Sequence, residues 1–145
     1  MKKKIVIGLV AVLILIQFIR PTRNTATGAS PDEISNYYDV PADIHAILKK
    51  SCYDCHSNNT SYPWYANLQP VGWWLQDHVN DGKDELNFSV FGTYAEKKAR
   101  HKFEEIEEMV GEGEMPLASY TFIHRSSSLT AQQSAAITAW AGALK

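Results

Sequence analysis

The only two cysteines of this 145-residue chain lie three positions apart, at Cys52 and Cys55, and His56 follows directly. On a helical turn, cysteines at this spacing lie on one side, where both can form thioethers with the vinyl groups of one haem. The next residue, His56, is then held beneath the iron as its proximal ligand. The pattern therefore predicts one covalently attached haem c per chain, bound by Cys52, Cys55 and His56. The acceptor for His56 Nδ1 is expected to be a backbone carbonyl in the loop over residues 57–70.

Two other chemistries use a Cys-x-x-Cys pair and remain alternatives. A zinc site needs further ligands, and only histidines are left to complete a Cys2His2 set, at unusual spacing: His45, His78, His101 and His124. A redox dithiol is typical of a strand–helix–strand context, which the sequence does not show. Haem attachment is the favoured interpretation.

The N-terminus combines positive charge with an apolar run. Lys2, Lys3 and Lys4 precede residues 5–19, of which thirteen out of fifteen are apolar. This pattern matches an export signal. The length of the run approaches the about 17–20 residues that a membrane span needs. The nearest small-residue cleavage site, Thr27-Gly28-Ala29, lies far downstream. We therefore expect residues 1–19 to form an uncleaved transmembrane signal-anchor helix, with a cleaved signal peptide as the alternative.

The rest of the chain divides into two parts. Residues 20–36 are rich in Thr, Ser, Asn, Ala and Pro, which predicts a flexible tether, and residues 37–145 form the predicted haem-binding domain. Apolar residues at helical spacing predict helices that begin near residue 41 and over 70–81, 93–111 and 130–144. Capping boxes mark residues 93–96 and 130–133, and Gly82 is expected to end the second helix. Long loops are expected over 57–69, 82–92 and 111–129, with extended segments or short strands at 88–91 and 120–123.

Four stretches carry a resemblance to a known family, the small bacterial haem-binding domain family with a single CxxCH motif. They are KKSCYDCHSNNTSYPWY, WWLQDHV, LNFSVFGTY and GEMPLASYTFIH. The resemblance spans residues 38–144, and the layout is also similar to that of monohaem cytochrome c. It implies an all-α fold: a small cytochrome c-like helical domain with long loops, here preceded by the N-terminal transmembrane helix. The resemblance says little about the physiological role.

The sixth iron ligand is left open between a methionine and a histidine. Met115 precedes Pro116, which disfavours helical geometry at Met115, in a glycine-containing loop. Cytochrome c-like proteins hold their distal methionine in a similar context. His78, on the apolar face of the helix predicted over residues 70–81, is the alternative ligand and would give a bis-histidine centre. Met109 is assigned to packing.

The aromatic residues Trp64 and Trp74 follow the motif closely. Large flat side chains suit the walls of a haem crevice, and an ordinary place in a small core is the alternative of equal weight. We include both residues among the candidates for cofactor binding.

Charge and composition limit the function further. The net charge is −2, so the chain lacks the excess of basic residues that is typical of a nucleic-acid binder. Without Lys2, Lys3 and Lys4, 11 of the 14 basic residues remain against 16 acidic ones, which favours partners with basic docking patches.

These features predict a membrane-tethered, periplasmic, monohaem c-type cytochrome-like protein that transfers single electrons to redox partner proteins. It would lie on the periplasmic side of the inner membrane, anchored through residues 5–19, or free in the periplasm if the signal is cleaved. The alternative is a haem-based sensor or gas-binding module with a labile or vacant sixth site. An electron carrier is favoured over an enzyme, and no catalytic residue is assigned.

Overall fold

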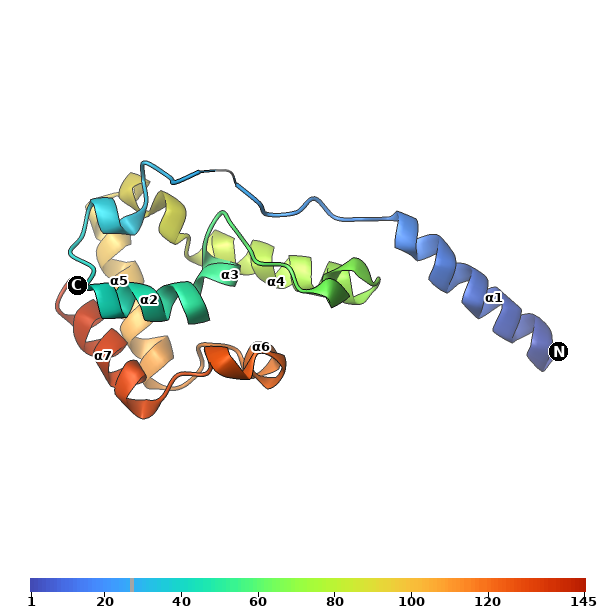
Figure 1. Cartoon of the computed structure of the whole chain (residues 1–145). Coiled ribbons are helices and arrows are strands. Elements are labelled where there is room, and N and C mark those ends of the chain that lie inside the picture. Colours follow the sequence, from blue (N-terminus) through green and yellow to red (C-terminus); the bar gives the residue numbers. More distant parts are fainter. Residues whose placement is uncertain (27) are drawn as a thin grey trace.

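The structure of the chain, a computed structural model, describes residues 1–26 and 28–145. Within these residues all regular secondary structure is helical, apart from one isolated bridge between Thr25 and Asn59 (Figure 1). The α-helices are α1 Lys2–Leu15, α2 Ala42–Ser51, α3 Tyr53–His56, α4 Val71–Glu85, α5 Glu96–Gly111, α6 Ala118–Ile123 and α7 Ala131–Gly142. The 3-10 helices are η1 Ile16–Phe18, η2 Ile34–Asn36, η3 Trp64–Asn67, η4 Phe88–Thr93 and η5 Arg125–Ser127. The all-helical prediction is confirmed.

The predicted membrane-spanning helix at the N-terminus is wrong. In the described part of the chain, no helix combines the length and the apolar character that crossing a membrane requires. The helix α1 has 14 residues, or about 21 Å at 1.5 Å per residue, whereas a bilayer core is about 30 Å thick. It gives way to η1, where Gln17 donates a hydrogen bond to the backbone carbonyl of Gln69 at 3.1 Å. The candidate cleavage site includes Thr27, which lies outside the described residues.

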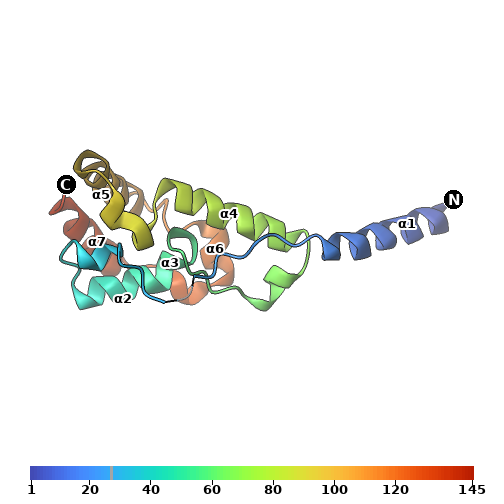
Figure 2. The same ribbon diagram turned by 90° about the horizontal axis from the view of Figure 1, so that it is seen from above.

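The core lies where α2, α5 and α7 pack together, away from α1 (Figures 1 and 2). The apolar stripe predicted on α5 is buried as expected: Ala99, Phe103, Ile106 and Val110. Phe103 packs edge-on against Trp140 of α7, with ring centroids 5.6 Å apart. The Trp140 indole N–H donates to the Asp39 carbonyl at 2.9 Å, which ties α7 to the chain that enters α2.

Three local predictions need correction. The helix α4 continues through Gly82 to Glu85, because Gly82 packs against the motif instead of ending the helix. Thr93 does not cap α5; its hydroxyl donates to the Val90 carbonyl within η4, whereas the Thr130 capping box of α7 is confirmed. The segments at 88–91 and 120–123 lie in helices η4 and α6, so neither is a strand.

The segment before the domain contacts the loop that follows the motif. The Asn24 side-chain amide donates to the Ser57 carbonyl at 2.7 Å and to the Thr60 hydroxyl at 2.8 Å. Lys83 of α4 donates to the Asn24 carbonyl oxygen at 2.6 Å. Further along the segment, Ile34 is fully buried in the core. These contacts fix the backbone that leaves the motif.

Candidate functional site

The Cys-x-x-Cys-His segment forms a single helical turn. Cys52 ends α2 with a φ of −124°, and α3 begins at Tyr53 with a small change of direction. The amides of Cys55 and His56 both donate to the Cys52 carbonyl, at 3.1 and 2.9 Å. The turn brings the two thiols and the imidazole to the same cavity, as the spacing predicted.

That cavity has a volume of about 660 Å³ and is lined mostly by apolar side chains. Sites for cofactor-sized ligands have volumes of about 300–1,000 Å³. Its lining residues come mainly from α3 and α4, which lie above α6 in Figure 1, and from the end of α5 and the chain leading into α6. The lining side chains that carry a nitrogen or sulfur atom able to bind haem iron or form a thioether are Cys52, Cys55, His56, His78, Met109 and Met115.

His56 is oriented by a backbone carbonyl. Its Nδ1–H donates to the carbonyl oxygen of Leu86, just after α4, at 3.0 Å. The predicted kind of acceptor is confirmed, but its location in the 57–70 loop is wrong, because the end of α4 and not that loop reaches the ring. Burial lowers the pKa of His56, so the ring is neutral near pH 7 and Nε2 keeps the lone pair that a metal ligand needs.

Gly82 allows α4 to lie directly on the motif. A Cβ atom at this position would lie 2.8 Å from the Cys55 carbonyl oxygen and 3.0 Å from Cys55 Cβ. Only glycine therefore permits this approach between α3 and α4. The close approach also sets the distance from α4 to His56, because the Leu86 carbonyl lies one turn further along the same chain.

The two thiols are not activated. Burial raises the pKa of Cys52 to about 12 and that of Cys55 to about 11, so both are protonated near neutral pH. Redox-active Cys-x-x-Cys pairs have lowered thiol pKa values, so the dithiol interpretation loses support. Among residues 1–26 and 28–145, no group of three or more His, Cys, Asp and Glu side chains is arranged to hold a metal ion.

Comparison with known proteins assigns the family. The family model described as "Haem-binding domain" matches residues 11–143, nearly the whole chain. The chain belongs to the haem-binding domain family. No curated protein and no solved structure matches it significantly.

The cavity suits the ligand that the family name specifies. It offers a neutral imidazole with a fixed tautomer, two thiols on one helical turn, thioether sulfur atoms and apolar walls. Imidazole and thioether are ligands that haem iron accepts, and thiols at this spacing are the groups that attach c-type haem. The residues present therefore fit haem.

Met115 reaches the cavity through a glycine turn. Gly113 has a φ of +77°, a conformation that glycine adopts without strain, and it reverses the chain after α5. The Met115 amide then donates to the Met109 carbonyl at 3.1 Å. Both methionines line the cavity, including Met109, which sequence reasoning assigned to packing. Because Met109 lies among glutamates on an exposed helical face, the sequence did not indicate that it lines the cavity.

His78 also lines the cavity, from α4. Its Nδ1 lies 2.9 Å from the Trp74 carbonyl one turn earlier in the same helix, and its ring packs on Trp74 with centroids 4.3 Å apart. Trp64 and Trp74 themselves are not brought to the cavity. Trp64, in η3, is 76% exposed, and Trp74, in α4, is 46% exposed.

The site also contains residues that the sequence did not single out. Tyr120 of α6 lines the cavity, and its hydroxyl donates to the Asp54 carboxylate inside the motif at 2.7 Å. His124 stacks on Tyr120 with ring centroids 4.6 Å apart and is hydrogen-bonded to Tyr65 at 2.6 Å. Since these partners are up to 66 residues apart in the chain, no local pattern could have indicated them.

Proposed function

We propose that this haem-binding protein is a c-type, monohaem electron carrier. Cys52 and Cys55 would attach one haem through thioethers, His56 would bind the iron through Nε2, and Met115 would be the sixth ligand. Haem held in this way supplies one-electron exchange at iron, and the protein contributes attachment, two axial ligands and a water-poor cavity.

One observation carries the proposal. The hydrogen bond from His56 Nδ1 to the Leu86 carbonyl fixes the ring in a cavity that both thiols also line. A buried imidazole with Nδ1 engaged and Nε2 unprotonated is the arrangement of a metal-ligating histidine. The two thiols on the same turn account for the covalent link.

The choice of Met115 over His78 rests on the side from which each residue comes. A haem held through His56 would need its other ligand from across the cavity. His78 belongs to α4, the helix that leads to the His56 acceptor, whereas Met115 leads into α6. Figure 1 shows α6 apart from α4, below it in the view, and residues from α4 and from the chain leading into α6 line the cavity. Met109, from α5, is the second thioether that lines the cavity.

We further propose that the protein acts in an exported compartment, the periplasm. Haem is attached to cysteines in this way after export, and residues 1–19 carry the charge and hydropathy of an export signal. Redox partners with basic surfaces would suit the carboxylates that border the cavity on α4 and α5. These are Asp81, Glu85, Glu105 and Glu108.

A haem-based gas sensor is the second candidate, favoured by a specific feature. A smaller cavity of about 230 Å³ borders Met115 and Pro116 on the side of α7. The thioether therefore has space to move away from the main cavity and open the sixth position. The electron carrier is preferred because the cavity offers both an imidazole and thioether sulfur atoms as possible ligands.

The test is expression of the full chain in a host that matures c-type haem, followed by mass measurement and absorption spectra. We expect one covalently bound haem, a low-spin spectrum in both oxidation states, and no reaction of the reduced protein with CO. The matched control, Cys52→Ser with Cys55→Ser, should carry no covalent haem. A high-spin protein that binds CO would point to the sensor, and a chain without haem would refute both candidates.

A further inference from the structure

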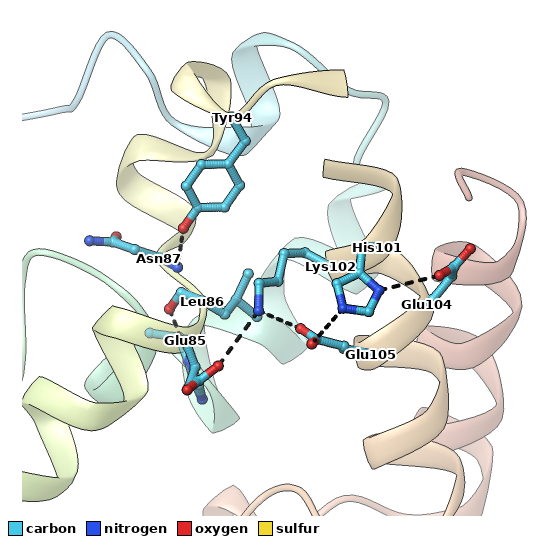
Figure 3. A network of polar contacts seen from close by, with 9 residues as sticks. Glu85, Leu86, Asn87, Tyr94, His101, Lys102, Glu104 and Glu105 are labelled. Atoms are coloured by element: carbon cyan, nitrogen blue, oxygen red, sulfur yellow. Dashed lines mark hydrogen bonds and ion pairs between the residues drawn. The ribbon is translucent and has the colours of Figure 1, made fainter. Parts of the chain in front are cut away.

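One lysine of the chain is buried, and it lies beside the proposed proximal side of the site. The Lys102 side chain on α5 is only 9% exposed. Its ammonium lies 2.6 Å from a Glu105 carboxylate oxygen on the same helix and 3.6 Å from a Glu85 carboxylate oxygen at the end of α4 (Figure 3). Lysine is almost never buried unless it is paired, so this cation has a defined place between the two helices.

Lys102 is connected to the wall of the cavity through its two ion-pair partners. Both carboxylates that pair with it, Glu85 and Glu105, line the cavity, and so does Leu86, whose carbonyl accepts the hydrogen bond from His56. The ammonium therefore lies directly behind the wall that orients His56.

The two carboxylates do not cancel this charge. The Glu85 side chain is 79% exposed and that of Glu105 is 38% exposed, so water screens both more strongly than it screens Lys102. Glu105 also has a second partner, since His101 Nε2 lies 3.1 Å from its other oxygen. Charges in a water-poor environment act over longer distances than exposed ones, so the field of the buried cation is weakened less by water than that of its two partners.

We infer that Lys102 raises the redox potential of the haem iron through space, with Glu105 and Glu85 as opposing, weaker charges. This inference rests on the function proposed above. A positive charge near the iron favours the reduced form, which carries one positive charge less. The alternative is that Lys102 only ties α4 to α5, in which case its charge has no effect on the potential.

The test is the midpoint potential of the haem-loaded full chain, measured by spectroelectrochemistry. Lys102→Met should shift the potential downwards, Lys102→Arg should keep it near that of the wild type, and Glu105→Gln should shift it upwards. Lys97→Met removes the same charge from an exposed position on the same helix and should give a much smaller shift than Lys102→Met. A shift of Lys102→Met that persists in high salt would support the buried site of action.

Opposite signs for Lys102→Met and Glu105→Gln separate an electrostatic effect from loss of structure, which would move both variants in the same direction. If Lys102→Met does not fold, Lys102→Arg and Glu105→Gln keep the inference testable. Equal shifts for Lys102→Met and Lys97→Met, or shifts of one sign for Lys102→Met and Glu105→Gln, would overturn it. A wild-type chain without covalent haem would instead refute the proposed function, and this inference with it.

Discussion

The two walls of the cavity are built by different means. The wall of α3 and α4 depends on close packing: Gly82 lies against Cys55, and the Leu86 carbonyl accepts the hydrogen bond from His56. The wall of Met115 and α6 depends on a glycine turn and on hydrogen bonds of side chains, chiefly that of Tyr120 to Asp54. The first wall is too closely packed at Gly82 to admit a further atom, whereas the second borders a further cavity beside Met115. A closely packed side at His56 and a more adaptable side at Met115 would suit the proposed iron centre, whose reactivity depends on its sixth ligand.

The largest expected effect is on the adaptable wall. Met115→Ala should remove the sixth ligand, so that the reduced haem binds CO and the weak long-wavelength band of a methionine–iron(III) bond disappears. Absorption spectra of the oxidised and CO-treated reduced protein check this. Met109→Ala and His78→Ala, which alter other cavity-lining residues, should leave the band in place. If the band instead disappears in Met109→Ala and remains in Met115→Ala, the ligand is the other methionine.

The rigid wall is tested by adding one methyl group. Gly82→Ala would place Cβ 2.8 Å from the Cys55 carbonyl oxygen, so the backbone of α3 or α4 must move. Such overpacking costs about 1–3 kcal/mol, against about 1 kcal/mol gained from the better helix propensity of alanine. We expect a net loss of stability in urea unfolding and a lower yield of attached haem.

Gly111→Ala is the matched control for this change. Its Cβ would meet only Thr138 Cγ2 at 3.6 Å, an ordinary contact, and it also lies in a helix. Its stability should be unchanged or slightly higher. Equal stabilities for Gly82→Ala and Gly111→Ala would show that the packing of α4 on the motif is looser than the structure indicates.

The features that the sequence could predict are those that depend on neighbouring residues. The cysteine spacing, the apolar stripe of α5 and the capping box of α7 are patterns within a few residues, and each predicted its element correctly. The sequence predicted that Gly82 ends the helix, because glycine is typical both of a helix end and of a site where two backbones pack closely. The use of Gly82 depends on Cys55, 27 positions away, which no local pattern contains.

Long-range contacts also account for the other differences. The Leu86 acceptor lies 30 residues from His56, and Tyr120 lies 66 residues from Asp54. The short helix α6 contains Thr, Tyr, Phe and Ile, which favour strands in isolation, so its helical form depends on its contacts with the motif. The size of Trp64 and Trp74 suits a haem wall and a small core equally, because size alone does not fix on which face of an element a residue lies.

The smallest expected effect concerns the hydrogen bond that joins α6 to the motif. Tyr120→Phe removes the donor to Asp54 and should cost about 1.5 kcal/mol, as for a typical hydrogen bond to a charged group. Burial and the Asp54 carboxylate raise the pKa of Tyr120, so the folded state keeps the phenol proton to higher pH than the unfolded state does. The stabilisation is therefore complete below the ordinary tyrosine pKa of about 10 and declines as pH rises above it.

Urea unfolding of the haem-loaded protein at neutral and alkaline pH measures both effects, and the alkaline decline should be smaller in Tyr120→Phe than in the wild type. Tyr37→Phe is the matched control, because Tyr37 also donates to a carboxylate, that of Asp32 at 3.2 Å, but from the surface. Its effect on stability should be smaller, since water competes for an exposed hydrogen bond. Similar losses for both variants would mean that the contact of α6 with Asp54 is no stronger than a surface contact. The wall that carries Met115 would then depend on the Gly113 turn, the Met109 carbonyl and the Tyr65–His124 hydrogen bond.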